Sequence, residues 1–422
     1  MLNQKKHIGI GFATGRTSFQ NVLRAYIFHL QESHFLTDND IVLSLFVAYD
    51  PTYRNTCRED YDNLTPEEKS IFYSCHFIGP EDIQDITNRL VASGLVSQKD
   101  AGYCFGTGYA VQRNIILYEA LGQKVDYLLF LDDDEYPLAV TRTQNTCLWS
   151  GQFVLEEHFK YLQFSDFTVG HHCGYLSPVP ALEYDDIMTE EDFYRFTQAL
   201  SSDVLKWDAV QEVIRSGGVT YADKQILMDQ KASLVEPVHG AKYLSGCNLG
   251  INLTRPERVL PFYNPPGARG EDSILSTCLA DYTVKSIPVY TFHDGFSIYG
   301  SLLKGVLPID LKKISLYESE HIHHRFYHAC IGWMRYKPLY TYLTQPQSCQ
   351  QLLSEAKENL NSTLSNVCAY FNNRGFERLR KELDAYTKKI PEHAEALNKT
   401  QQVWHTIAVA QADRTEPVAS GR

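Results

Sequence analysis

The segment that decides the fold is Tyr127-Leu-Leu-Phe-Leu-Asp-Asp-Asp-Glu-Tyr-Pro137, in which an apolar run of strand length ends directly in four acidic residues. Clustered carboxylates beside a core repel one another and cost desolvation energy, and a bound cation would remove that penalty. Mg²⁺ and Mn²⁺ prefer such oxygens and are often shared with ligand phosphates. Open α/β sheets bind ligands beyond the carboxyl ends of their strands, where these acids are expected. The run therefore indicates a metal and ligand site, and the alternative is a solvated acidic turn.

The chain on the N-terminal side of this run alternates between strand and helix patterns. Residues 8–12 and the nearly all-apolar residues 41–49 are expected to form strands, the second of them covered on both faces. A helical spacing follows the first strand, and residues 82–95 and 108–121 predict two further helices. Such alternation predicts an α/β fold with a mostly parallel sheet and helices on both faces.

The rest of the chain sets the expected domain boundaries. Helical patterns fill most of residues 156–230, a strand pair is expected at 243–253 and 286–292, and helical patterns then continue almost to the end. We therefore expect an α/β domain over residues 1–300 with a helical insertion at about 156–230. A helical C-terminal extension over 301–411 and a flexible tail over 412–422 complete the prediction.

Charge and composition exclude several classes of protein. The 422 residues include 39 Lys+Arg and 51 Asp+Glu, a net charge of -12, which argues against a nucleic-acid partner but leaves room for a small anion held locally. No stretch approaches the ~18 apolar residues of a transmembrane helix, and the N-terminus does not resemble a signal peptide. The 10 cysteines form no Cys-x-x-Cys pair, so we expect reduced thiols and a cytoplasmic location.

Five short motifs resemble, in their types and order, those of GT-A fold glycosyltransferases, in particular the inverting, family 2-like members. They are Gly108-Tyr-Ala-Val-Gln-Arg113-Asn114, Phe130-Leu-Asp132-Asp133-Asp134, Leu244-Ser-Gly246-Cys-Asn248-Leu-Gly250, Gly270-Glu271-Asp272 and Phe292-His293-Asp294. In that family they correspond to an Arg-Asn pair near the nucleotide, the Asp-x-Asp motif, a Gly-rich strand at the sugar pocket, a Glu-Asp pair at a helix start and a metal-binding histidine. The resemblance covers roughly residues 7–300.

The resemblance implies a nucleoside diphosphate sugar as donor, held with Mn²⁺ or Mg²⁺. Asp134 would ligate the metal directly, His293 would be a second protein ligand, and Asp132 would lie near the ribose or the metal. The ion would stabilise charge on the leaving diphosphate, and an imidazole ligand favours Mn²⁺. The alternative for His293 is a histidine in a simple turn.

The resemblance also implies a donor-binding set at the strand ends. Arg16 and Arg113 would neutralise the diphosphate, and Asp50 would accept hydrogen bonds from the base or the sugar. The alternatives are surface charges for the two arginines and a turn at Asp50, which precedes a proline. The complete expected set is Thr14, Arg16, Asp50, Arg113, Asn114, Asp132, Asp133, Gly246 and Asn248.

The resemblance assigns catalysis to Asp272 and Glu271. Asp272 would be the general base that takes the proton of the acceptor hydroxyl, so that the anomeric centre inverts, and Glu271 would bind acceptor hydroxyls. The alternative is that both acids serve the dipole of the helix that they begin. The acceptor itself, whether glycan, lipid or small molecule, stays open.

Two histidine groups carry weaker expectations. His321, His324 and His328 share one helical face, which favours a packed or acceptor-facing role over a zinc site because no further ligand completes the set. Residues 171–175 are interpreted as a loop that contacts the acceptor.

Two other functions compete with the glycosyltransferase reading. A sugar nucleotidyltransferase would need a Gly-rich loop with Arg and Lys near the first strand, and residues 9–16 lack it. A sugar-binding protein with a decayed site is disfavoured by the intact acids at Asp132, Asp134 and Asp272.

Overall fold

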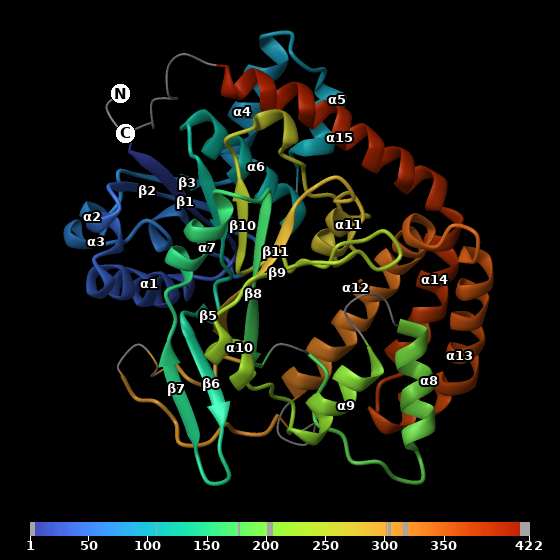
Figure 1. Cartoon of the computed structure of the whole chain (residues 1–422). Helices are drawn as coiled ribbons and strands as arrows, with labels where there is room; N and C mark the ends of the chain where they lie inside the picture. The colour runs from blue at the N-terminus through green and yellow to red at the C-terminus, as the bar shows by residue number, and fades with distance from the viewer. Residues whose placement is uncertain are drawn as a thin grey trace.

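The computed structural model describes residues 5–106, 108–175, 178–200, 206–300, 302, 305–314 and 320–413. It is an α/β structure in which helices cover a central sheet (Figure 1). The strands are β1 (Lys6–Thr14), β2 (Ile41–Tyr49), β3 (Ser74–Ile78), β4 (Tyr127–Phe130), β5 (Glu135–Tyr136), β6 (Leu138–Arg142), β7 (Cys147–Gly151), β8 (Phe167–Gly174), β9 (Ser233–Leu234), β10 (Leu249–Asn252) and β11 (Val284–His293). The α-helices are α1 (Phe19–Ser33), α2 (Phe35–Asp38), α3 (Pro66–Ser70), α4 (Pro80–Ala92), α5 (Gln98–Cys104), α6 (Tyr109–Gly122), α7 (Val154–Leu162), α8 (Glu190–Leu200), α9 (Trp207–Arg215), α10 (Lys224–Asp229), α11 (Glu271–Ser276), α12 (Glu320–Thr344), α13 (Cys349–Tyr370), α14 (Arg378–Lys388) and α15 (Ile390–Ala412).

The main sheet is mixed and mostly parallel. Its strand order is β3-β2-β1-β4-β10-β8-β11-β5, and β9 pairs with β11 off this path. The first four strands in this order are parallel to one another, and β8 is parallel to β11. β10 runs antiparallel to both of its neighbours, β4 and β8. The expected α/β class with a mostly parallel sheet is therefore confirmed.

The sequence of β1 explains how closely the helices approach the sheet. Ile8 and Ile10 are buried on one face, and Gly9 and Gly11 alternate with them on the other. A Cβ added at Gly11 would lie 2.8 Å from a methyl carbon of Ile116 on α6, so only glycine allows this contact. The alternation thus brings α6, and Arg113 with it, directly against the central strands.

Two hydrophobic clusters fill the two faces of the sheet. One joins α1 and α7 to the sheet through residues such as Val22, Leu155 and Ile10. The other joins α6 and α15 to it through Ile116, Trp404 and Phe130 among others. The predicted helices on both faces are present, and those on the second face include α15, the last helix among the described residues.

The middle of the chain differs from the prediction at two points. The expected helical insertion at 156–230 is interrupted by β8, a central strand between β10 and β11. Helix α7 precedes this strand, and α8–α10 follow it from Glu190 on. β10 and β11 lie in the regions expected for a strand pair, but they do not pair because β8 separates them. Neighbours in a sheet need not be neighbours in sequence, so the spacing alone could not reveal this order.

The C-terminal helices pack onto the α/β domain as well as onto one another. α13 packs against α8, α12 packs against α14, and α15 packs against α5 and α6. Trp404 of α15 is 1% exposed and donates a 2.8 Å hydrogen bond from Nε1 to the carbonyl oxygen of Val259. The expected extension is therefore part of the same packed core. Of the expected tail at 412–422, residues 414–422 lie outside the described part.

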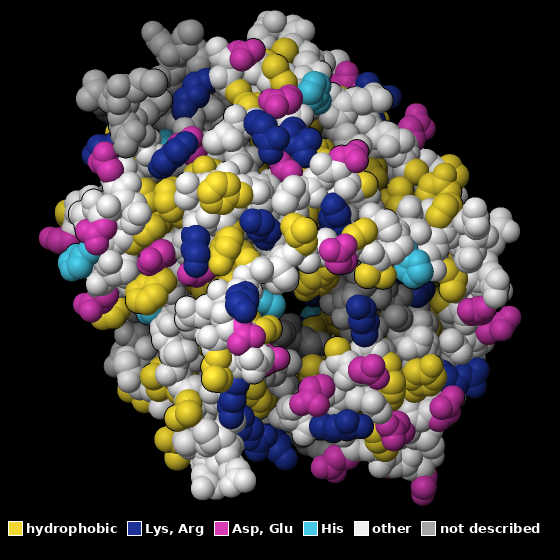
Figure 2. Space-filling view, in the orientation of Figure 1, with side chains coloured by type: hydrophobic (Ala, Val, Ile, Leu, Met, Phe, Trp, Pro, Cys, Tyr) yellow, Lys and Arg dark blue, Asp and Glu magenta, His cyan; other side chains and the backbone are white. Residues whose placement is uncertain are grey.

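Three further observations bear on the composition. Within the described residues, no helix combines the length and the apolar character that crossing a membrane requires. All 10 cysteines are free thiols. On the face shown in Figure 2, the coloured basic and acidic side chains are interspersed rather than separated into large areas of one sign.

The packing of α15 leads to a stability prediction. Trp404→Ala removes a buried indole and leaves the Val259 carbonyl without its donor, so the free energy of unfolding should fall by about 3–5 kcal/mol. His405→Ala, at an exposed position on the same helix, is the matched control and should change stability by less than about 0.5 kcal/mol. Urea unfolding followed by circular dichroism measures both. A loss of under about 1 kcal/mol in Trp404→Ala would show that α15 contributes little to the core.

Candidate functional site

The acid run lies where β4 leaves the sheet. β1 and β4 are parallel neighbours, and the chain departs from β1 toward β2 on one side and returns from β3 to β4 on the other. The carboxyl ends of β1 and β4 therefore border a topological switch point, where open α/β sheets place ligand sites. Thr14 is the last residue of β1 and Arg16 follows it, residues 132–134 follow β4, and these two segments meet there.

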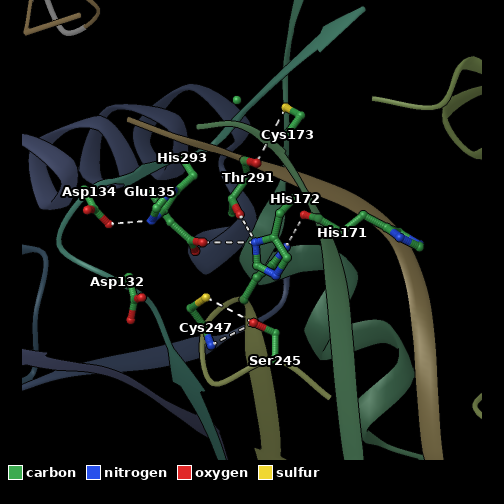
Figure 3. A network of polar contacts seen from close by, with 12 residues as sticks. Asp132, Asp134, Glu135, His171, His172, Cys173, Ser245, Cys247, Thr291 and His293 are labelled. Carbon is green, nitrogen blue, oxygen red and sulfur yellow. Dashed lines mark hydrogen bonds and ion pairs between the residues drawn. The ribbon is translucent and has the colours of Figure 1, made fainter. Parts of the chain in front are cut away.

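Asp134 is held between a histidine and an arginine. Its Oδ1 lies 3.1 Å from Nε2 of His293, and its Oδ2 accepts a 2.8 Å hydrogen bond from Nη1 of Arg16. β11 pairs with β5, which sets His293 opposite Glu135 beside the acid run (Figure 3). Nδ1 of His293 lies 2.6 Å from the carbonyl oxygen of Tyr175 and donates to it, so Nε2 is directed at Asp134.

The Asp134–His293 pair is charged. Burial disfavours both charged groups, but their mutual attraction and hydrogen bond outweigh it. The pKa of Asp134 consequently falls well below its usual range, with Arg16 adding to the effect. The pKa of His293 rises to about 9 for the same reason. Without a bound metal, the two side chains are therefore a buried ion pair at neutral pH.

Asp133 has a different environment from its neighbour. Thr14 Oγ1 donates a 2.6 Å hydrogen bond to its Oδ2, and Arg16 Nη1 lies 3.1 Å from its Oδ1. Burial raises the pKa of Asp133 to about 7, since Arg16 only partly offsets the burial and the charge of Asp134. Asp133 therefore links the ends of β1 and β4.

Arg113 joins three of the predicted motifs. Its side chain is buried, its Nη1 donates to the carbonyl oxygen of Gly246, and its Nη2 lies 3.3 Å from Asp132 Oδ1. Its Nε lies 3.6 Å from Glu271 Oε1. The guanidinium also lies 5.1 Å from the ring centre of Phe130, a favourable cation–π arrangement. Asp132 and Glu271 thus compensate a buried cation and do not face solvent as a free pair.

Asp272 holds the Gly-rich segment to the start of α11. Its Oδ2 accepts a 3.0 Å hydrogen bond from the N–H of Gly246, and its Oδ1 accepts one of 2.8 Å from the N–H of Ser273. A Cβ at Gly246 would lie 3.1 Å from Arg113 Nη2, which explains the glycine. Asp272 therefore has the helix-start contacts of the alternative interpretation, and the prediction that it is a base remains to be tested.

Three of the predicted donor residues make internal contacts that account for their presence. Asn114 is fully buried and bonds both the N–H and the carbonyl of Phe262. Asn248, at φ 48°, donates from Nδ2 to the carbonyl of His171, and its Oδ1 accepts a 2.9 Å hydrogen bond from Nε2 of His158. Asp50 accepts two hydrogen bonds from Thr52 in a turn. Their amides and carboxylate thus shape the loops around the site, and the structure does not bring them into contact with the acid run.

A second polar cluster, which the sequence did not reveal, lies behind the first. Glu135, His172 and Cys247 offer ligand-type atoms that all lie within 4.8 Å of one another (Figure 3). His172 Nδ1 lies 3.0 Å from Glu135 Oε1 and 3.0 Å from Thr291 Oγ1. Burial raises the pKa of the Cys247 thiol well above its usual value, and nearby Asp132 and Glu135 add to the effect. The clue in the sequence was that all three residues belong to, or adjoin, motifs already noted.

The expected metal set divides between two places. Asp134 and His293 converge, whereas Asp132 faces Arg113. Among the described residues, the one group of three ligand-type side chains that meets is Glu135, His172 and Cys247, and it does not include Asp132. The reason is electrostatic. The buried guanidinium of Arg113 attracts the Asp132 carboxylate, whereas the neighbouring acids repel it.

A large cleft adjoins the acid run. Its volume is about 1090 Å³, and it is lined by the loop after β2, the start of α6, residues 262–269 and one side of α12. Residues 132–134 do not line it. Arg16 does line it, and because Arg16 also binds Asp133 and Asp134, it links the cleft to the acids.

Comparison with known proteins adds no family to this picture. No protein-family model matches the chain, and no curated protein matches its sequence.

The ion pair leads to a prediction about pH. His293 has a folded-state pKa above its usual 6.5, so its contribution to stability is complete below that value and is lost as pH rises through about 9. With a chelator present, raising the pH from 7 to 9.5 should therefore destabilise the wild type more than His293→Gln, as measured by urea unfolding. Stability curves that stay parallel over this range would contradict the assignment.

Proposed function

We propose that the protein is a metal-dependent glycosyltransferase with a GT-A-like α/β domain, which moves a sugar from a nucleoside diphosphate sugar to an acceptor hydroxyl. The observation that carries the proposal is the meeting of residues distant in sequence at one switch point. Arg16, Asp133, Asp134 and His293 contact one another there, and Arg113 links Asp132 to Glu271. These side chains come from motifs that resemble the family in order and in type.

The cleft supports a donor of this class. Its volume of about 1090 Å³ is at the upper end of ligand pockets, enough for a nucleotide with a sugar. Tyr53, Tyr109 and Phe262 line it and offer ring faces to a base. Arg16, between the cleft and the acids, can bind a diphosphate on one side while it holds Asp133 and Asp134 on the other.

Asp134 and His293 fit a divalent ion. Two ligands at ~2.1 Å from one ion and at right angles to it lie roughly 3 Å apart, close to the observed 3.1 Å between Asp134 Oδ1 and His293 Nε2. The Nδ1–H of His293 donates to a carbonyl, as metal-bound histidines usually do. When bound, Mn²⁺ or Mg²⁺ would act as a Lewis acid toward the leaving diphosphate. Arg16 adds positive charge at the same place.

The acceptor side rests on Asp272 and Glu271. In the proposed reaction Asp272 takes the proton of the acceptor hydroxyl on the face opposite the leaving group, so the anomeric configuration inverts. Its hydrogen bonds from the N–H groups of Gly246 and Ser273 would fix its position. Glu271, which forms an ion pair with Arg113, would bind acceptor hydroxyls.

The donor and the metal are tested together. A thermal-shift screen of nucleoside diphosphates should show stabilisation with Mn²⁺ and none with a chelator, since a ligand at 100 times its Kd adds about 2.7 kcal/mol. Asp134→Ala should abolish the shift. Asp85→Ala, at an exposed position on α4, is the control and should keep it. Binding by Asp134→Ala in metal-free buffer that is as tight as binding by the wild type with Mn²⁺ would exclude the metal site, and release of pyrophosphate in place of a nucleoside diphosphate would indicate a nucleotidyltransferase.

The variant Asp272→Asn tests whether Asp272 acts as a catalytic base or only caps its helix. It keeps the shape of the side chain and removes its basicity, so turnover should drop by ~10²-fold or more while nucleotide affinity stays nearly unchanged. Asp223→Asn, at the start of α10 where Asp223 accepts from the N–H of Gln225, is a control for the loss of a capping carboxylate. Calorimetry gives affinity, and proton NMR gives the product anomer. A product that retains the donor's configuration, or full turnover in Asp272→Asn, would remove Asp272 as the base.

A further inference from the structure

The cleft is strongly cationic although the chain as a whole is acidic. Its lining contains five arginines and two histidines, and within the described residues it contains no Asp or Glu, in a protein of net charge -12. These residues are Arg16, Arg54, Arg269, Arg325, Arg335, His324 and His328. Such a local excess of one sign in a concave site concentrates anions.

Not all of these cations have a carboxylate partner. Arg16 binds Asp133 and Asp134, and Arg335 forms a two-pronged pair with Glu382 at 2.8 and 2.9 Å. Among the described residues, Arg54, Arg269 and Arg325 have no carboxylate within ion-pair distance, and Arg54 lies 5.4 Å from the ring centre of Tyr53. Arg325 instead lies 4.6 Å from the ring centre of Phe296. These three guanidinium groups, each with five N–H donors, thus remain available to a ligand.

Two of these unpaired cations, Arg325 and Arg269, lie at different positions along the cleft. Arg325 lies close to His293, because both side chains approach Gly295. A Cβ added at Gly295 would lie 2.9 Å from Arg325 Nη2 and 2.6 Å from His293 Cε1. Arg269 lies farther along, where its side chain packs against Gly332 of α12. The first position suits the donor diphosphate, and the second is a separate place for negative charge.

Two histidines of α12 line the cleft near Arg269. His324 and His328 are one turn apart, and their Nε2 atoms lie only 2.9 Å from each other. Burial lowers the pKa of His328, and the neighbouring His324, Arg378, Arg269 and Arg335 add to the effect. An anion bound beside His328 would raise the pKa of this side chain and gain a charged hydrogen-bond donor. No carboxylate of the described chain fills this role.

We infer that Arg269, His324 and His328 bind a phosphate monoester carried by the acceptor. The assignment of the phosphate to an acceptor rests on the proposed glycosyltransferase function. The anion site itself rests only on the three residues named. A phosphate dianion fits better than a carboxylate, because its three terminal oxygens can accept from the guanidinium fork and from two imidazoles at once. The sugar acceptor would then lie between this site and the donor, with its hydroxyl toward α11.

Inorganic phosphate is the probe for the site. Calorimetry should detect its binding to the wild type, and the Arg269→Gln/His324→Gln double variant should bind it at least 10-fold more weakly. Arg89→Gln, at an exposed position on α4, is the charge-matched control and should leave phosphate affinity unchanged. Acetate at equal ionic strength should bind much more weakly than phosphate. Equal phosphate affinity in the wild type and the double variant would overturn the site, and equal binding of acetate would overturn its assignment to phosphate.

A second titration places the site relative to the donor. It adds phosphate to protein saturated with UDP or GDP and Mg²⁺, which avoids precipitation of manganese phosphate. We expect phosphate affinity within about twofold of that without nucleotide, and nucleotide affinity unchanged in the double variant. Displacement of phosphate by nucleotide would overturn the acceptor assignment, since one site would then serve both anions. Failure of every nucleotide to bind, with phosphate binding still lost in the double variant, would refute the glycosyltransferase proposal and keep the anion site.

Discussion

A single buried guanidinium organises the site. Removing an arginine from water is costly unless its charge and its donors are compensated, and Arg113 obtains that compensation from three distant segments. The segment after β4 supplies Asp132, the Gly-rich segment supplies a carbonyl, and α11 supplies Glu271. Because each segment satisfies the same side chain, their relative positions are coupled. Asp272, which holds the Gly-rich segment from the other side, completes this arrangement.

The acid run shows how neighbouring carboxylates acquire different properties. Asp133 and Asp134 are adjacent, yet the pKa of Asp133 rises to about 7 and that of Asp134 falls well below its usual range. Burial raises both. The difference is that Asp134 faces a protonated imidazole and an arginine, whereas Asp133 shares the arginine and otherwise faces a hydroxyl. Two adjacent aspartates therefore differ in pKa because their partners differ.

Much of this site could be predicted from the sequence because its main elements are local. The strand followed by acids is visible in one stretch, and with the α/β alternation it places residues 132–134 at the carboxyl edge of the sheet, where α/β proteins bind ligands. The roles of Asn114 and Asn248 could not be predicted, since their partners, Phe262 and His158, are far away in sequence. The cluster of Glu135, His172 and Cys247 was also missed. It depends on β8 lying between β10 and β11, a non-local order that no periodicity records.

The position of α15 has a consequence for how the chain is made. This helix covers α6, which carries Arg113, and its Trp404 belongs to the same hydrophobic cluster as Phe130 at the end of β4. During synthesis the strands, the acid run and α6 all emerge from the ribosome long before Ile390, where α15 begins. Until then the side of α6 that α15 covers stays exposed on the nascent chain. Burial of that apolar surface therefore waits for α15.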